Sequence, residues 1–332
     1  MDIRDKKGLT AAAEQALSKA GYDPRLLALI HTGAALGVSF ILTLISYFLT
    51  RQIDTTGGLA GMGVRSVLST AQAMLSIGSA VIMPFWEIGF FAAAIRMARQ
   101  QPNGPDTLLS GFRRFGPVLR LTLLRAILIG FIGFLCLQIS SGIFLMTPFS
   151  NPLMEATEAL MAQGTPVIDD ALIQSLMPHM VPMYWIFGIL FCVIAIPVLY
   201  RFRMADFVMM DDKPIGALRA LGASHKMMRY NRFSLFKLDL QFWWFYALQL
   251  LSLGLCYGDQ LLPAMGISLP INGDTAFFLF FGIHLVCQLV LAWFAQSRVQ
   301  TTYACAYEAL LPEYLDPEPP VMKNLPWDHL PQ

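Results

Sequence analysis

The sequence predicts an all-α polytopic membrane protein with six transmembrane helices and basic amphipathic interfacial helices on the cytoplasmic face. Hydrophobic residues make up 56% of the 332 residues and charged residues only 14%, whereas soluble domains carry roughly a quarter charged residues. The apolar residues gather in long segments, and the lysines and arginines gather on one side of those segments. These observations together indicate the fold class.

Six apolar segments are each long enough to cross a bilayer, which needs about 20 residues. Several are longer than the membrane is thick, so we expect tilted helices or helices that continue beyond it. The predicted spans cover residues 26–50, 67–97, 118–146, 181–209, 235–256 and 276–295.

Basic residues predict the orientation of these spans. The loops over residues 147–180 and 257–275 contain no lysine or arginine, and Arg51 and Arg65 are the only basic residues on that side. The remaining lysines and arginines lie in or beside the segments on the opposite side. By the positive-inside rule, we expect a multi-pass protein of the cell membrane with cytoplasmic N- and C-termini.

The chain divides into three parts on composition. Residues 1–25 form a cytoplasmic amphipathic segment with no apolar signal-peptide core. Residues 26–310 form the six-helix bundle, and residues 311–332 form a proline-rich cytoplasmic tail.

Two basic linkers on the cytoplasmic side resemble each other in pattern. The first linker is "GPDTLLSGFRRFGPVLR" (residues 104–120), and the second linker is "DKPIGALRALGASHKMMRYNRF" (residues 212–233). Each mixes apolar and basic positions, which is typical of a helix lying on anionic lipid head groups. The alternative is a solvated loop. The candidate anionic-lipid contacts are Arg113, Arg114, Arg219, Lys226, Arg229 and Arg232.

Motifs for catalysis are absent from the sequence. Its five histidines form no H-E-x-x-H pair, its five cysteines have no metal-ligand spacing, and no G-x-S-x-G or phosphate-binding loop occurs. We therefore expect no enzyme activity, no catalytic residue, no cofactor and no metal. The net charge of +1 also argues against a nucleic-acid partner.

Two ionisable residues lie well inside predicted spans, and they are the candidate intramembrane polar site. Glu87 occurs in "MPFWEIGFF", and His284 occurs in the last span. A carboxylate at bilayer depth is costly and needs a partner or water. Glu87 is therefore a hydrogen-bonded group inside the bundle beside Pro84, a proton or cation site in a transport path, or a shallow water-exposed group.

One stretch resembles a known family. "YRFRMADFVMMDDKPIGALRALGASHKMMRYNRFSLFKLDLQFWWFYALQLLSLGLCYGDQLLP" (residues 200–263) has an acidic turn with proline, then "A-x-x-A-x-x-x-S", a basic stretch and an aromatic-rich span. With "TTYACAYEALL" near the C-terminus, it is similar to an uncharacterised family of six-span bacterial integral membrane proteins, a domain-of-unknown-function family. The resemblance implies a bacterial cytoplasmic-membrane protein and assigns no catalytic residue.

These observations favour a non-enzymatic membrane assembly or scaffold component that interacts with lipid or with membrane partners, including a second copy of the chain. The alternative is a transporter or permease with a polar site near Glu87. A transporter predicts a polar cavity that reaches Glu87, whereas a scaffold predicts a closed bundle with exposed surfaces for lipid or protein.

Overall fold

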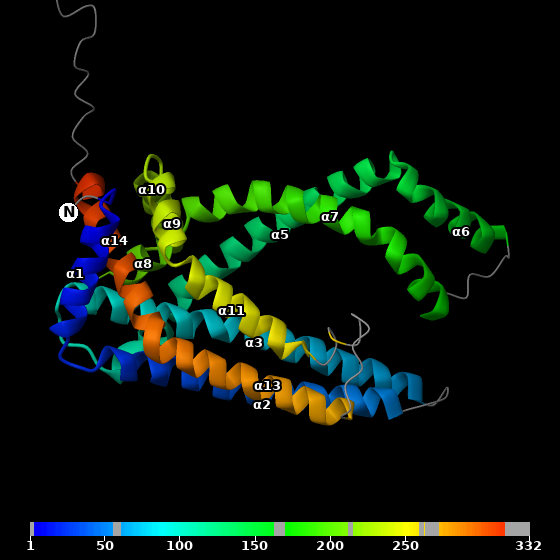
Figure 1. The fold of residues 1–332 in the computed structure, drawn as a ribbon, viewed down its shortest axis with the longest axis horizontal. Coiled ribbons are helices and arrows are strands. Elements are labelled where there is room, and N and C mark those ends of the chain that lie inside the picture. The colour runs from blue at the N-terminus through cyan, green and yellow to red at the C-terminus, as the bar shows by residue number, and fades with distance from the viewer. Residues whose placement is uncertain are drawn as a thin grey trace, which may run out of the picture. The chain divides into compact units, whose positions relative to one another are not determined.

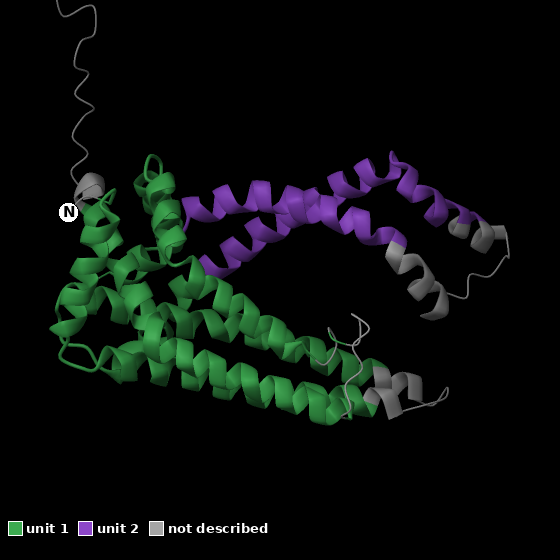
Figure 2. Ribbon diagram, in the orientation of Figure 1, with its two compact units in different colours: residues 1–120, 204–332 green, residues 121–203 purple. Residues whose placement is uncertain are grey.

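The computed structural model describes residues 3–55, 61–162, 170–211, 215–258, 262 and 272–315. Within these ranges the chain is all-helical and contains no strand, which confirms the predicted fold class (Figure 1). In the described part of the chain, five helices are long and apolar enough to cross a membrane. The chain forms two compact units: unit 1 comprises residues 1–120 and 204–332, and unit 2 comprises residues 121–203 (Figure 2).

Unit 1 is built on long apolar helices. Helices α2 (Pro24–Thr55) and α3 (Gly61–Ala98) pack against each other, and α13 (Gly273–Leu291) packs on α11 (Trp243–Cys256). A π-helical turn, Ala292–Gln296, joins α13 to α14 (Ser297–Leu315) and contacts α2. Such turns widen a helix locally and often occur at functional sites.

Short helices gather at one end of unit 1, where α14 packs on α3, and we call this the short-helix end (Figure 1). They are α1 (Lys6–Ser18), a 3₁₀ turn (Pro105–Leu109), α4 (Ser110–Arg113), α8 (Ala205–Met210), α9 (Ala217–Met227) and α10 (Arg232–Gln241). Most of the fully buried large side chains lie here, including Leu9, Leu108, Met204 and Tyr307. Farther along the long helices, apolar side chains such as Phe48 and Val286 are exposed.

Unit 2 contains most of α5 (Phe115–Leu145), then a 3₁₀ turn (Pro148–Ser150), α6 (Asn151–Ala162) and α7 (Asp170–Arg201). A small apolar core joins α5 to α7 and includes Ile132, Cys136 and Ala195. The Arg125 guanidinium adds a hydrogen bond to the Phe202 carbonyl, 2.7 Å away.

The boundaries correct three predicted spans. Span 235–256 is not one helix, because the chain breaks at Phe242 and leaves α11 with 14 residues, shorter than a bilayer needs. Span 181–209 ends at Arg201, and α8 follows as a separate helix. Span 276–295 continues through the π turn, and α14 ends at Leu315, inside the predicted tail. Residues 316–332 lie outside the described residues.

Candidate functional site

The first linker packs directly against the backbone of α3. A Cβ atom added to Gly89 would lie 1.9 Å from the Leu108 carbonyl oxygen, and one added to Gly111 would lie 2.0 Å from the Phe85 carbonyl oxygen. Only glycine allows two backbones to approach this closely. Arg96 adds a hydrogen bond from its Nη1 to the Thr107 hydroxyl, 3.3 Å away. These contacts hold the first linker beside the end of α3.

A network of charged side chains then joins α3, α8 and α14, and we call it the Arg99 network. Arg99 Nη1 lies 2.6 Å from Asp211 Oδ1, and Arg99 Nε lies 2.8 Å from Glu308 Oε1. The Tyr307 hydroxyl donates to Asp211 Oδ2 at 2.8 Å. Arg114 donates to the carbonyls of Met209 and Asp211 at 2.6 and 2.8 Å. Each of these side chains forms a hydrogen bond or an ion pair within the protein, so the network is suited to holding helices together.

The electrostatics of the Arg99 network favour the charged state of the guanidinium. Partial burial opposes that charge, but the hydrogen bond to Asp211 and the nearby Glu308 carboxylate outweigh the penalty and raise the pKa of Arg99 above its usual value. A half-buried arginine with two carboxylates is a strong, directional tie.

Helix α14 also carries a second polar contact one turn before the Arg99 network. The Tyr303 hydroxyl donates to Asp239 of α10 and lies 2.8 Å from the Tyr246 hydroxyl of α11. Tyr303, Tyr307 and Glu308 all belong to "TTYACAYEALL", and Asp211 belongs to the acidic turn of the longer matching stretch. The two segments that carry the family resemblance therefore meet in space through these side chains.

Glu87 does not form the hydrogen bond considered for the bundle interior. Its side chain is exposed, and among the described residues it makes no hydrogen bond or ion pair. One polar cavity of unit 1 is described below, and Glu87 is not among the residues that line it.

His284 lies on α13, far from Glu87 in the sequence, and its hydrogen-bond partner is Ser252 of α11. Its Nδ1 lies 3.0 Å from the Ser252 hydroxyl and 2.9 Å from the Ser252 carbonyl oxygen. The contact ties α13 to α11. Within the described residues, no hydrogen bond or ion pair joins Glu87 and His284.

The candidate lipid contacts fall into two groups. Arg113, Arg219, Lys226 and Arg229 are exposed, as a surface contact requires. Arg114 and Arg232 are only partly exposed, and Arg114 is bound to the two carbonyls described above. Lipid contact by these residues stays a prediction.

A buried polar contact that sequence reasoning missed centres on His31 of α2. Its ring stacks on Phe90 and Trp86, with centroids 4.6 and 5.8 Å apart. Gln296 of the π turn places its Nε2 3.3 Å from His31 Nδ1, and Thr32 donates to the Gln296 amide oxygen. The available signal was the pair His31 and Thr32, two polar residues several positions inside the first predicted apolar segment.

The Arg99 network was missed as well. In the sequence, these three residues look like ordinary charges beside apolar segments. The long sequence separations between Arg99, Asp211 and Glu308 do not indicate that they pair. Opposite charges near the same predicted membrane edge would have been the only signal.

No match was found among curated proteins or among solved structures. A family model, by contrast, matches residues 1–310, which is nearly the whole chain and far more than the two segments that carry the resemblance. The prediction of an uncharacterised family is confirmed. The chain belongs to the family described as "Protein of unknown function (DUF975)".

Proposed function

We propose that this protein is a non-enzymatic scaffold of the cytoplasmic membrane whose inner face binds anionic lipid. The observation that carries the proposal is the exposed surface of α9, α10 and the short segment between them, which combines basic side chains with apolar ones. Arg219, Lys226, Arg229 and Lys237 are exposed there, together with Leu218, Tyr230 and Phe233. We call this set the basic–aromatic face.

The structure of α9 explains why this face is available. Its alanines and Met227 form a buried stripe that packs on α8 and α14, so the basic positions point away from unit 1. Aromatic rings support the cations: Lys237 Nζ lies 4.5 Å from the Phe233 ring centre, and the Arg229 guanidinium lies 5.4 Å from that of Tyr230. Leu218 and Tyr230 are 73% and 75% exposed. Exposed apolar groups beside cations are typical of a surface that enters a lipid interface.

Cytoplasmic termini are part of this proposal and can be tested by thiol labelling in intact cells. Met146, at the end of α5, is 89% exposed. We expect a cysteine at Met146 to react with an impermeant maleimide, and one at Arg219 to react only after the cells are permeabilised. The unmodified chain supplies the background from its five native cysteines. Labelling at position 219 in intact cells would contradict the orientation.

Lipid binding is tested with the full chain in detergent, by native mass spectrometry with phosphatidylglycerol and phosphatidylcholine of matched acyl chains. Each cation near an anionic surface contributes about 1 kcal/mol. We therefore expect the triple variant Arg219→Gln, Lys226→Gln, Arg229→Gln to lose at least about tenfold in phosphatidylglycerol affinity, and added salt to weaken binding by the unmodified chain. Arg51→Gln, which removes an exposed arginine elsewhere, is the control.

Unchanged phosphatidylglycerol affinity in the triple variant would contradict the proposal. Transport is the competing outcome: a proton leak in proteoliposomes that Glu87→Gln abolishes would favour a transporter, because the amide cannot ionise.

A further inference from the structure

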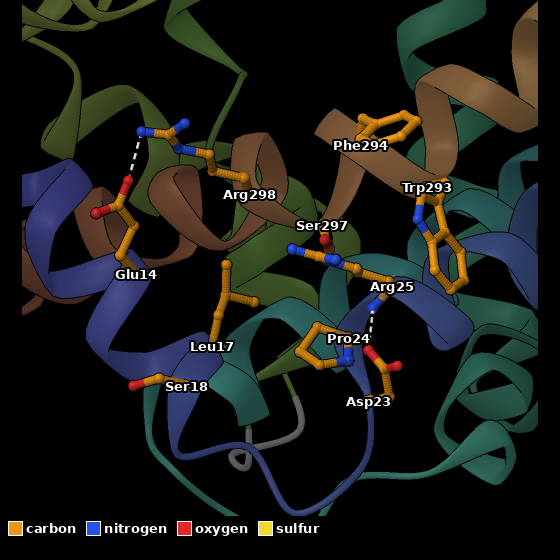
Figure 3. A pocket seen from close by; sticks show the side chains of 10 residues that line it. All are labelled: Glu14, Leu17, Ser18, Asp23, Pro24, Arg25, Trp293, Phe294, Ser297 and Arg298. Atoms are coloured by element: carbon orange, nitrogen blue, oxygen red, sulfur yellow. Dashed lines mark hydrogen bonds and ion pairs between the residues drawn. The ribbon is translucent and has the colours of Figure 1, made fainter.

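A polar cavity of about 450 Å³ lies in unit 1 between α1, the start of α2 and the junction of the π turn with α14 (Figure 3). Its lining includes Glu14, Asp23, Arg25, Trp293, Ser297 and Arg298. The volume falls within the range of small-ligand pockets. None of these residues belongs to the basic–aromatic face or to the Arg99 network.

The charges that line the cavity are balanced and partly paired. Arg298 forms an ion pair with Glu14, and Asp23 accepts a hydrogen bond from the backbone N–H of Arg25 at 2.9 Å. Within the described part of the chain, the Arg25 guanidinium has no hydrogen-bond or ion-pair partner, and Figure 3 shows it extending toward Ser297. Two guanidinium groups and two carboxylates suit a zwitterion better than a ligand with only negative charge.

The position of the cavity along the helices indicates the kind of zwitterion. Pro24 begins the first apolar helix, and Trp293 and Phe294 lie at the end of the last apolar segment. Phe294 is 73% exposed beside the cavity. Aromatic side chains at such a boundary lie at the depth of lipid head groups, so a bound molecule can place a polar head in the cavity and an apolar chain along Phe294.

We propose that this cavity binds the head group of a zwitterionic phospholipid that carries a primary ammonium group, as phosphatidylethanolamine does. Arg25 binds the phosphate through a charge-assisted hydrogen bond, and the carboxylates of Glu14 and Asp23 accept hydrogen bonds from the ammonium. The inference rests on the proposed membrane insertion and assigns a second lipid class to a second site.

Hydrogen-bond chemistry separates this lipid from its relatives. The ammonium of phosphatidylethanolamine offers three N–H donors to the carboxylates, whereas the trimethylammonium of phosphatidylcholine offers none. Phosphatidylglycerol lacks a cation and would leave the carboxylates facing a phosphate. The expected order of affinity at this cavity is therefore ethanolamine, then choline, then glycerol lipids.

The test uses the full chain in detergent and native mass spectrometry with the three lipids in matched acyl chains. We expect the unmodified protein to bind phosphatidylethanolamine about tenfold more tightly than phosphatidylcholine. Arg25→Gln should weaken phosphatidylethanolamine binding about tenfold, and Arg25→Lys should retain most of it. Glu14→Gln should reduce the preference for ethanolamine over choline. Arg51→Gln, which removes an exposed arginine outside the cavity, should leave the preference for ethanolamine unchanged.

Equal affinity for ethanolamine and choline lipids, or unchanged affinity in Arg25→Gln, would overturn the proposal. Soluble glycerophosphoethanolamine that binds as tightly as the lipid would overturn the membrane source of the ligand. The triple variant of the basic–aromatic face keeps the two proposals apart, because it should reduce phosphatidylglycerol binding and leave the ethanolamine preference intact.

Discussion

The two basic linkers of unit 1 are fastened to the bundle by different means. The first linker lies backbone against backbone on α3, through Gly89 and Gly111. The second linker is held by side chains: the buried stripe of α9 packs on its neighbours, and the buried Ser224 hydroxyl accepts a hydrogen bond from the Met204 N–H at 3.2 Å. The two linkers are therefore similar in composition but differ in how they are attached. Glycine placement attaches the first linker to α3, and helix amphipathicity attaches the second linker to its neighbours.

The way in which each linker is attached determines which of its side chains remain exposed to a partner. Close backbone contact leaves the first linker as a 3₁₀ turn and one short helix before α5 begins at Phe115, with Arg114 directed to protein carbonyls. The second linker forms a full amphipathic helix, and its cations remain exposed. We therefore expect the second linker to carry surface recognition and the first to carry stability.

Substitution of glycine should show the largest contrast. Gly111→Ala would drive a methyl group into the Phe85 carbonyl, and we expect a loss of about 3 kcal/mol in unfolding free energy. Gly222→Ala in α9 meets nothing within 4 Å and should stabilise the protein by about 0.5–1 kcal/mol. Unfolding in mixed detergent–SDS micelles measures both. A tolerated Gly111→Ala would contradict the close packing.

Removing the central arginine of the Arg99 network should have a smaller effect. Arg99→Gln leaves Asp211 and Glu308 without their cation, and we expect a loss of about 2 kcal/mol. The same unfolding assay applied to Arg113→Gln should show no measurable change, because Arg113 is exposed. Equal effects of the two substitutions would mean that the network adds no stability.

The smallest effect is expected at Glu87, which lies on the α3 segment that contacts the first linker but is itself exposed. Glu87→Gln should change the unfolding free energy by less than about 0.5 kcal/mol, because no hydrogen bond to a described residue is lost. A larger loss would indicate a partner for the carboxylate. Gly89→Ala, two residues away, is the matched positive control.

The sequence by itself determined the all-α fold class, the long apolar helices and the amphipathic helix of the second linker. Hydropathy and helical periodicity are local properties of the chain, so they can be read without knowing what packs where. The break at Phe242, the π turn and the close contact at Gly89 and Gly111 depended on the tertiary structure. Each of them is set by what a distant segment places beside it.

The candidate site was decided almost entirely by tertiary structure. Sequence reasoning named Glu87 and His284 for their depth in apolar segments, but contacts between helices determined that His284 meets Ser252 and that Glu87 makes no hydrogen bond within the described residues. Arg99 and Asp211 stand 112 residues apart, and their 2.6 Å contact exists because α3 and α8 end at the same place. Charge and hydropathy place a side chain at a depth, whereas only packing selects its partner.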